Sequence, residues 1–121
     1  MLSLSPAIRI FLCAEPADLR KSFDGLGALV RQALGDDPLS GHWFVFKNRK
    51  GDRLKILAWE EDGWCLWYKR LEQGIFRFPA AASGGPPRVE VRAAALAMLL
   101  DGVVLEKVQR RKRYHRPATG K

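Results

Sequence analysis

The sequence has few of the residues on which metal sites, disulfide scaffolds and most enzyme active sites depend. Its 121 residues include two cysteines and two histidines, and Cys13 and Cys65 show no C-x-x-C spacing. We predict that both thiols are reduced and buried, as free cysteines usually are. His42 and His115 stand at a predicted strand start and in a basic segment, where packing or solvation is the expected role.

Enzyme motifs are missing as well. The chain contains no phosphate-binding loop, no dinucleotide-binding turn and no nucleophile elbow. Most of its 13 carboxylates fall in predicted turns and helix starts, such as Asp36-Asp37 and Glu60-Glu61-Asp62. A catalytic site needs groups that converge, and no convergent set can be named. We therefore predict a protein without catalytic activity, metal, cofactor or small-molecule substrate.

Long hydrophobic runs are absent too. No window approaches the roughly 20 residues that span a bilayer. The short apolar run near the N-terminus has no basic residues before it, unlike a signal peptide. We expect a soluble, cytoplasmic protein without a membrane partner. With 47% hydrophobic residues, the chain can bury a core without disulfides, so we predict a single globular domain over residues 1–106.

Positive charge is concentrated toward the C-terminus. The formal net charge is +8, but residues 1–106 hold 14 cations against all 13 acids and carry only +1. The rest lies in a segment with seven cations and no acid: Lys107, Arg110, Arg111, Lys112, Arg113, Arg116 and Lys121. Residues 109–121 have almost no apolar content, so we predict that residues 107–121 form a disordered basic tail that attracts polyanions without sequence specificity.

The stretch from Trp43 to Pro79 holds all four tryptophans and four of the six phenylalanines. Its short runs of aromatic and β-branched residues are cut by turn signals at 48–51 and 62–63, a pattern typical of an antiparallel meander. We predict strands near residues 42–47, 53–60, 64–71 and 75–78. A further strand is expected over residues 7–14, between two prolines.

The turn lengths predict which side chains share a face of this sheet, because successive strand residues point to opposite sides. One face would carry Phe44, Phe46, Arg53, Lys55, Leu57, Trp59, Trp64, Leu66, Tyr68 and Arg70. The other would carry Trp43, Val45, Leu54, Ile56, Ala58, Cys65 and Trp67. The second face is the more apolar, so we expect the helices to cover it. The first mixes rings with cations, as surfaces that stack bases and hold phosphates do.

Two helices are expected to flank the meander. Apolar residues recur at helical spacing from Leu19 to Leu34, which predicts a long N-terminal helix over residues 18–34 that ends at Gly35. A spacer of small residues and prolines follows Pro79. A short C-terminal helix is predicted from Val91 to Leu99. The fold class is therefore α+β, with a mainly antiparallel sheet packed against both helices.

Two groups of cations within the domain, together with Arg70, are candidate nucleic-acid contacts. Between residues 47 and 55 five cations face one acid, Asp52, as expected of a hairpin tip that contacts phosphates. The alternative for this tip is a sheet edge protected by charge against aggregation. For Arg20 and Lys21 the alternative is a solvated helix surface. With the tail, the candidates are Arg20, Lys21, Lys47, Arg49, Lys50, Arg53, Lys55, Arg70, Lys107, Arg110, Arg111, Lys112, Arg113 and Arg116.

Two long segments resemble a known family. DLRKSFDGL (residues 18–26) and SGHWFVFKNRKGDRLKILAWEEDGWCLWYKRLEQGIFRFP (residues 40–79) are similar to the TnpB, or Orf2-like, accessory proteins of the insertion-sequence-66 family of bacterial mobile elements. The segment from Leu96 to Gly102 is similar as well. The resemblance implies a bacterial element in which a separate transposase carries the catalytic carboxylates, and which this protein assists without cutting DNA.

Two functions remain open at this point. The first is a non-catalytic accessory factor that binds DNA, with the hairpin tip and the tail as its contacts. The second is a protein-interaction module that binds the transposase and does not bind DNA specifically. Its interface would be the aromatic residues of the first sheet face, Phe44, Phe46, Trp59, Trp64 and Tyr68.

Overall fold

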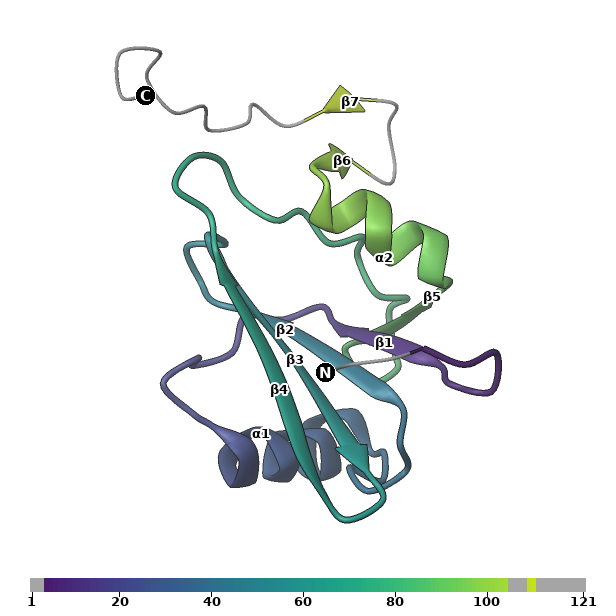
Figure 1. The fold of residues 1–121 in the computed structure, drawn as a ribbon. Helices are drawn as coiled ribbons and strands as arrows, with labels where there is room; N and C mark the ends of the chain where they lie inside the picture. Colours follow the sequence, from purple (N-terminus) through teal and green to yellow (C-terminus); the bar gives the residue numbers. More distant parts are fainter. Residues whose placement is uncertain (1–3, 105–108, 111–121) are drawn as a thin grey trace.

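The computed structural model describes residues 4–104 and 109–110, and within them a five-stranded sheet forms the centre of the fold (Figure 1). The strands are β1 (Ile10–Cys13), β2 (Trp43–Lys47), β3 (Arg53–Glu60), β4 (Gly63–Arg70) and β5 (Arg88–Val91), in the order β4-β3-β2-β1-β5. The β1–β2 pair is parallel and the other three pairs are antiparallel. The expected α+β class with a mainly antiparallel sheet is confirmed.

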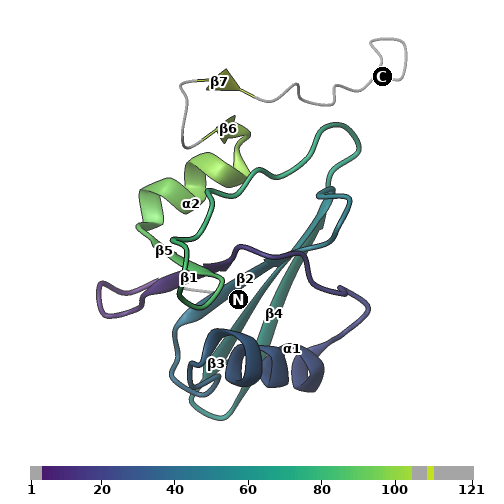
Figure 2. The same cartoon turned by 180° about the vertical axis from the view of Figure 1, so that it is seen from behind.

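Helices cover both faces of the sheet (Figures 1 and 2). α1 (Phe23–Leu29) continues as a π-helical turn, η1 (Val30–Leu34), and these connect the parallel strands β1 and β2. α2 (Ala93–Leu100) lies on the opposite face. The two short strands β6 (Val103–Val104) and β7 (Gln109–Arg110) pair with each other in a separate sheet. The helical connection from β1 to β2 is needed because a tight turn cannot join two parallel strands.

The sheet divides the core into two clusters. On the α1 side Leu26, Val30 and Leu34 pack with Phe11, Phe44, Phe46 and Leu57. On the α2 side Leu96 and Leu99 pack with Ile10, Leu12, Val45, Leu54, Ile56 and Phe76. All four residues of β1 are buried, as expected of a strand that is covered on both faces.

The predicted sharing of faces is confirmed, but the expectation that one face lies open is wrong. Opposed pairs such as Phe44 with Leu57, and Trp59 with Trp64, share the face that the turn lengths predicted. The helices were expected on the other face, whereas α1 packs on this one. The crossover from β1 to β2 brings α1 there, and the sequence of the meander contains no signal for it.

The N-terminal helix is shorter than predicted. It begins at Phe23, because residues 18–21 form a turn instead of a first helical turn. The Asp18 carboxylate accepts hydrogen bonds from the Arg20 backbone N–H at 3.0 Å and from the Arg20 guanidinium. Aspartate often competes in this way with helix formation. Leu19 is nevertheless buried in the core, so its apolar spacing reports burial rather than a helix.

The strand predicted at 75–78 is wrong, and the fifth strand lies elsewhere. Residues 71–87 form no strand, although Phe76 is fully buried and its N–H donates to the Gly51 carbonyl at 2.7 Å. The fifth strand, β5, follows the predicted spacer and pairs antiparallel with β1. Val91, which was expected in the short helix, ends this strand. The apolar pattern at residues 75–78 therefore reflects the burial of Phe76 and not a strand.

The cysteines are both free. Cys13 is buried, as predicted, and burial raises the pKa of its thiol. Cys65 is only half-buried, and its Sγ donates to a carboxylate oxygen of Glu60 at 3.1 Å. The predicted core position is therefore right for Cys13 and wrong for Cys65.

Candidate functional site

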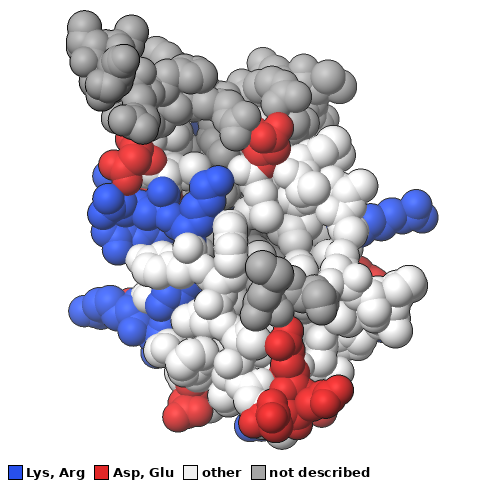
Figure 3. Space-filling model, viewed as in Figure 1, with Lys and Arg blue, Asp and Glu red and all other residues white. Residues whose placement is uncertain are grey.

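The β3–β4 hairpin separates charge along its length. Its turn carries Glu60, Glu61 and Asp62, whereas its open end carries Arg53 and Arg70 in directly opposed positions. Figure 3 shows acidic side chains gathered at the lower end of the molecule and a group of cations on the left side above it, with further acidic atoms beside that group. Residues 1–106 carry a net charge of only +1, yet the open end of this hairpin is basic. We call it the basic end.

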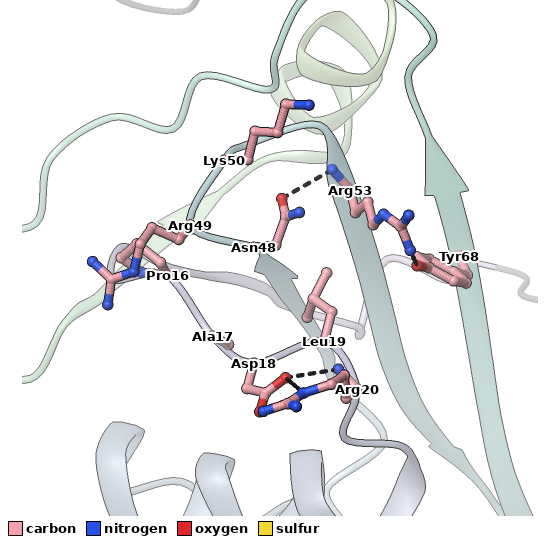
Figure 4. A pocket seen from close by; sticks show the side chains of 10 residues that line it. All are labelled: Pro16, Ala17, Asp18, Leu19, Arg20, Asn48, Arg49, Lys50, Arg53 and Tyr68. Carbon is pink, nitrogen blue, oxygen red and sulfur yellow. Dashed lines mark hydrogen bonds and ion pairs between the residues drawn. The ribbon is translucent and has the colours of Figure 1, made fainter.

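A pocket of about 480 Å³ lies at this basic end (Figure 4). The loop of residues 16–20, the β2–β3 loop, the start of β3 and the last part of β4 meet there. It is lined by the cations Arg20, Arg49, Lys50 and Arg53, by Asp18, Asn48 and Tyr68, and by the apolar residues Pro16, Ala17 and Leu19. Four cations against one acid give the lining a formal charge of +3. The pocket is open to solvent.

Asn48 holds the loop between β2 and β3 in place. Its Oδ1 accepts the backbone N–H groups of Gly51 at 2.9 Å and Arg53 at 3.0 Å, and its Nδ2 donates to Asp52 Oδ1 at 2.8 Å. The bond from Asn48 lowers the pKa of the Asp52 carboxyl. Gly51 has φ +86°, and a Cβ there would lie 3.2 Å from Ile75 Cβ. The cations Arg49 and Lys50 are thus presented by a fixed loop.

The opposite wall, residues 16–20, is fixed by the sheet. The Ala17 N–H donates to the Lys47 carbonyl at 2.8 Å, and Lys55 Nζ donates to the Lys21 carbonyl at 2.9 Å. Lys55 is only 7% exposed, and its ammonium lies 4.8 Å from the centre of the Tyr68 ring. Its candidacy as a nucleic-acid contact is therefore wrong: the ammonium binds the pocket wall and cannot reach a phosphate.

Arg53 and Tyr68 form the third side of the pocket. Arg53 Nη1 donates to the Tyr68 hydroxyl at 2.8 Å, as Figure 4 shows. Tyr68 is 48% exposed and Arg53 is exposed. Within the part of the chain that the structure describes, neither Arg53 nor Arg49 forms an ion pair. Both guanidinium groups are therefore available to an anion.

The structure brings some of the other candidate cations near this pocket and separates the rest. Lys21 is exposed just beyond the wall, and Arg70 lies beside Arg53 with its side chain bonded to Glu72 at 2.9 Å. Lys47 is half-buried, with its ammonium 4.9 Å from the Phe78 ring, and burial lowers its pKa. Its candidacy as a phosphate contact is therefore weakened. Of the tail candidates, Arg110 is described only as part of β7, and Lys107, Arg111, Lys112, Arg113 and Arg116 lie outside the described residues.

The proposed aromatic interface is not a continuous exposed surface. Phe44 and Phe46 are 1% and 0% exposed beneath α1, so they cannot contact a partner, and their candidacy is wrong. Trp59 and Trp64 are half-buried and pack edge to face with ring centres 5.1 Å apart. Of the five rings only Tyr68 is exposed. Because α1 packs on this face, two of the five rings belong to the core and two more are half-buried.

Asn48, Asp18 and Leu19 were not identified as site residues by their sequence context. The turn signal Asn48-Arg49-Lys50-Gly51 was visible, but it indicated only a loop. That the loop faces residues 16–20 depends on the parallel pairing of β1 with β2. No local pattern reports such a pairing.

Among the described residues no group of His, Cys, Asp or Glu is placed to hold a metal ion. No helix in residues 4–104 and 109–110 is long and apolar enough to cross a bilayer.

The fold and the pocket define a small mixed-sheet domain with a preorganised, solvent-open basic site. The chain belongs to the insertion-sequence-associated family described as IS66 Orf2 like protein, whose profile matches residues 8–110. Two similar relatives come from Sinorhizobium fredii (strain NBRC 101917 / NGR234). "Uncharacterized protein y4jC" is 34% identical, covering 92% of each chain. "Uncharacterized protein y4hO" is 34% identical, covering 85% of this chain and 87% of its own. No solved structure matches the chain.

Proposed function

We propose that this protein is a non-catalytic accessory factor of an insertion sequence that binds DNA through the basic pocket. The observation that carries the proposal is the convergence of Arg20, Arg49, Lys50 and Arg53 from two loops and a strand start. These residues are up to 33 positions apart in the sequence, and the fold places them around one hollow. The family supports a role in the life of an insertion sequence.

The electrostatics of the basic end favour a polyanion. Arg53 and Arg70 are directly opposed on neighbouring strands, where like charges repel, and the Glu72 carboxylate pairs with Arg70 only. Arg49 and Arg53 have no carboxylate partner among the described residues, so a phosphate can bind them without displacing an ion pair. Phosphate contacts of this kind supply most of the affinity for DNA and make it depend on salt.

The test is a salt titration of binding to a labelled DNA duplex by the full chain and two double variants. Arg49→Ala with Arg53→Ala removes two pocket cations. Arg31→Ala with Arg92→Ala removes two exposed cations that do not line the pocket, and so leaves the same net charge. Each phosphate contact contributes about 0.9 to the slope of log affinity against log salt. The pocket variant should therefore flatten the slope by roughly 1.8, and the control variant by much less.

Equal slopes in the two variants would contradict a role for the pocket, because they would show that only net charge matters. A transposition assay then tests the biological role: the element should move less often with the pocket variant than with the control variant. The transposase remains a proposed partner. Co-purification of the transposase with the full chain would support this partnership, and it should persist with the Arg49→Ala, Arg53→Ala variant.

A further inference from the structure

We infer that the basic end binds single-stranded DNA in preference to duplex, with the Tyr68 ring as a stacking surface for a base. This inference rests on the proposed function and adds to it the form of DNA that is recognised. The observations behind it are a second hollow that shares residues with the pocket, and the surroundings and exposure of the Tyr68 ring.

Two hollows adjoin the Arg53–Tyr68 pair. One is the pocket of about 480 Å³, and the other is a smaller hollow of about 350 Å³ lined by Arg53, Tyr68, Arg70 and Glu72. Arg53 and Tyr68 line both hollows. Each volume lies within the range of sites that hold a small organic ligand. The two hollows therefore suit consecutive nucleotides of one strand that crosses the Arg53–Tyr68 pair.

The Tyr68 ring is prepared for stacking. Lys55 Nζ lies over the ring at 4.8 Å from its centre, and the hydroxyl accepts the bond from Arg53. The ring is therefore held at two points, yet the residue remains 48% exposed. Stacking on a fixed ring costs little conformational entropy. The Arg53 guanidinium beside the ring places positive charge within reach of the phosphates of a stacked nucleotide, whereas the buried Lys55 ammonium only holds the ring.

Duplex DNA cannot use these features fully. Its bases are stacked on each other and present only their edges in the grooves. A duplex can place phosphates against Arg49, Lys50 and Arg53, but it leaves the Tyr68 ring uncovered. A single strand can turn a base onto the exposed ring.

The experiment measures the affinity of the full chain for a labelled oligothymidine and for a duplex of equal length. Tyr68→Ala removes the ring, and Tyr68→Phe keeps the ring but removes the hydroxyl that binds Arg53. Trp67→Ala is the matched control, since Trp67 is the neighbouring exposed ring on the opposite face of β4. Wild type should bind the single strand more tightly. Tyr68→Ala should weaken that binding by roughly 5- to 150-fold, the usual range for one stacked base.

The other variants separate the possible outcomes. Tyr68→Phe and Trp67→Ala should stay within about threefold of wild type on the single strand, and Tyr68→Ala should change duplex affinity by less than about threefold. Equal affinity for both DNA forms, or an equal loss on both in Tyr68→Ala, would overturn the inference. If the Arg49→Ala, Arg53→Ala variant still loses duplex binding in that case, the proposed function stands without the single-strand preference. Thermal melts of each variant show whether a loss reflects unfolding.

Discussion

Among single residues, Asn48 has the most influence on the basic pocket. Its side chain makes three hydrogen bonds within one loop, to Gly51, Asp52 and Arg53. These bonds set the path of the backbone that carries Arg49 and Lys50. A loop held in this way presents its cations without paying much ordering entropy when an anion binds. The chemistry of the site thus depends on a neutral residue that no charge pattern would reveal.

We expect Asn48→Ala to lower the free energy of unfolding by about 1–3 kcal/mol, because two backbone N–H donors and the Asp52 carboxylate lose their partner. Urea unfolding at pH 7 measures this loss. Gln32→Ala, which removes an amide from an exposed position of η1, is the control and should change stability by less than about 0.5 kcal/mol. An equal loss in the two variants would show that the loop is not held by Asn48.

The same variant has a pH dependence that follows from Asp52. The pKa of Asp52 is lowered in the folded state, first by the bond from Asn48. This stabilisation is present above the unfolded pKa of about 3.9 and is lost as the pH falls through the folded pKa. The stability difference between wild type and Asn48→Ala should therefore be smaller at low pH than at pH 7. A difference that does not change with pH would exclude the Asn48–Asp52 bond as its source.

At the scale of elements, the two helices have different relations to the sheet. α1 and η1 bury Leu26, Val30 and Leu34 on the face that also carries the basic pocket. α2 buries Leu96 and Leu99 on the opposite face. α1 lies toward the turn end of the β3–β4 hairpin, where a Cβ at Gly27 would be 3.5 Å from the Trp64 ring (Figure 1). The open end of the hairpin therefore keeps Arg53, Tyr68 and Arg70 exposed.

Each of the two core clusters should be necessary for folding. Leu26→Asp and Ile56→Asp place a charge at positions that are 0% and 2% exposed, one in each cluster. An unpaired buried charge costs several kcal/mol against a total stability of roughly 5–15 kcal/mol. We expect neither variant to show a cooperative melt in circular dichroism. Phe23→Asp, on the exposed side of the first turn of α1, should still fold. A cooperative melt in either core variant would contradict this two-sided core.

At the scale of the whole molecule, charge is divided between a structured site and the C-terminal segment. Residues 1–106 carry +1 and residues 107–121 carry +7. Within residues 1–106 the charges are separated in space. Glu60, Glu61 and Asp62 lie at the turn of the β3–β4 hairpin, and Arg53 and Arg70 lie at its open end. A DNA backbone would be attracted to one end of the domain and repelled by the other. The net charge of residues 1–106 therefore underestimates how strongly the basic end can attract a DNA backbone.

Deleting residues 107–121 should separate the two contributions. If about five of the seven cations contact phosphates, the slope of log affinity against log salt should become less negative by roughly 4.5. The truncated chain should keep the difference between the Arg49→Ala, Arg53→Ala variant and its control, because the pocket lies within residues 16–68. Salt titrations of both chains measure this. An unchanged slope after truncation would assign binding to the domain alone, and loss of the pocket effect would make the site dependent on the tail.

Local sequence determined the parts of this protein that depend on near neighbours. Turn residues such as those at 48–51 and 62–63 set the register of the β2–β3–β4 meander, and with it the sharing of faces by Phe44, Leu57 and Leu66. The family is likewise visible in two ungapped segments, and its profile covers residues 8–110. Hairpins are predictable in this way because their pairing is decided within a few residues of the turn.

Only the tertiary structure decided which surfaces remain open. Phe44 and Phe46 alternate with the same period whether solvent or α1 covers them, so their burial could not be deduced from the pattern. The same holds for Lys55, whose charge suggested a phosphate contact although its ammonium binds the Lys21 carbonyl. β5 and the 16–20 wall depend on pairings between residues far apart in the chain. Burial is a property of what lies across the sheet, and a local pattern records only which side chains could be buried together.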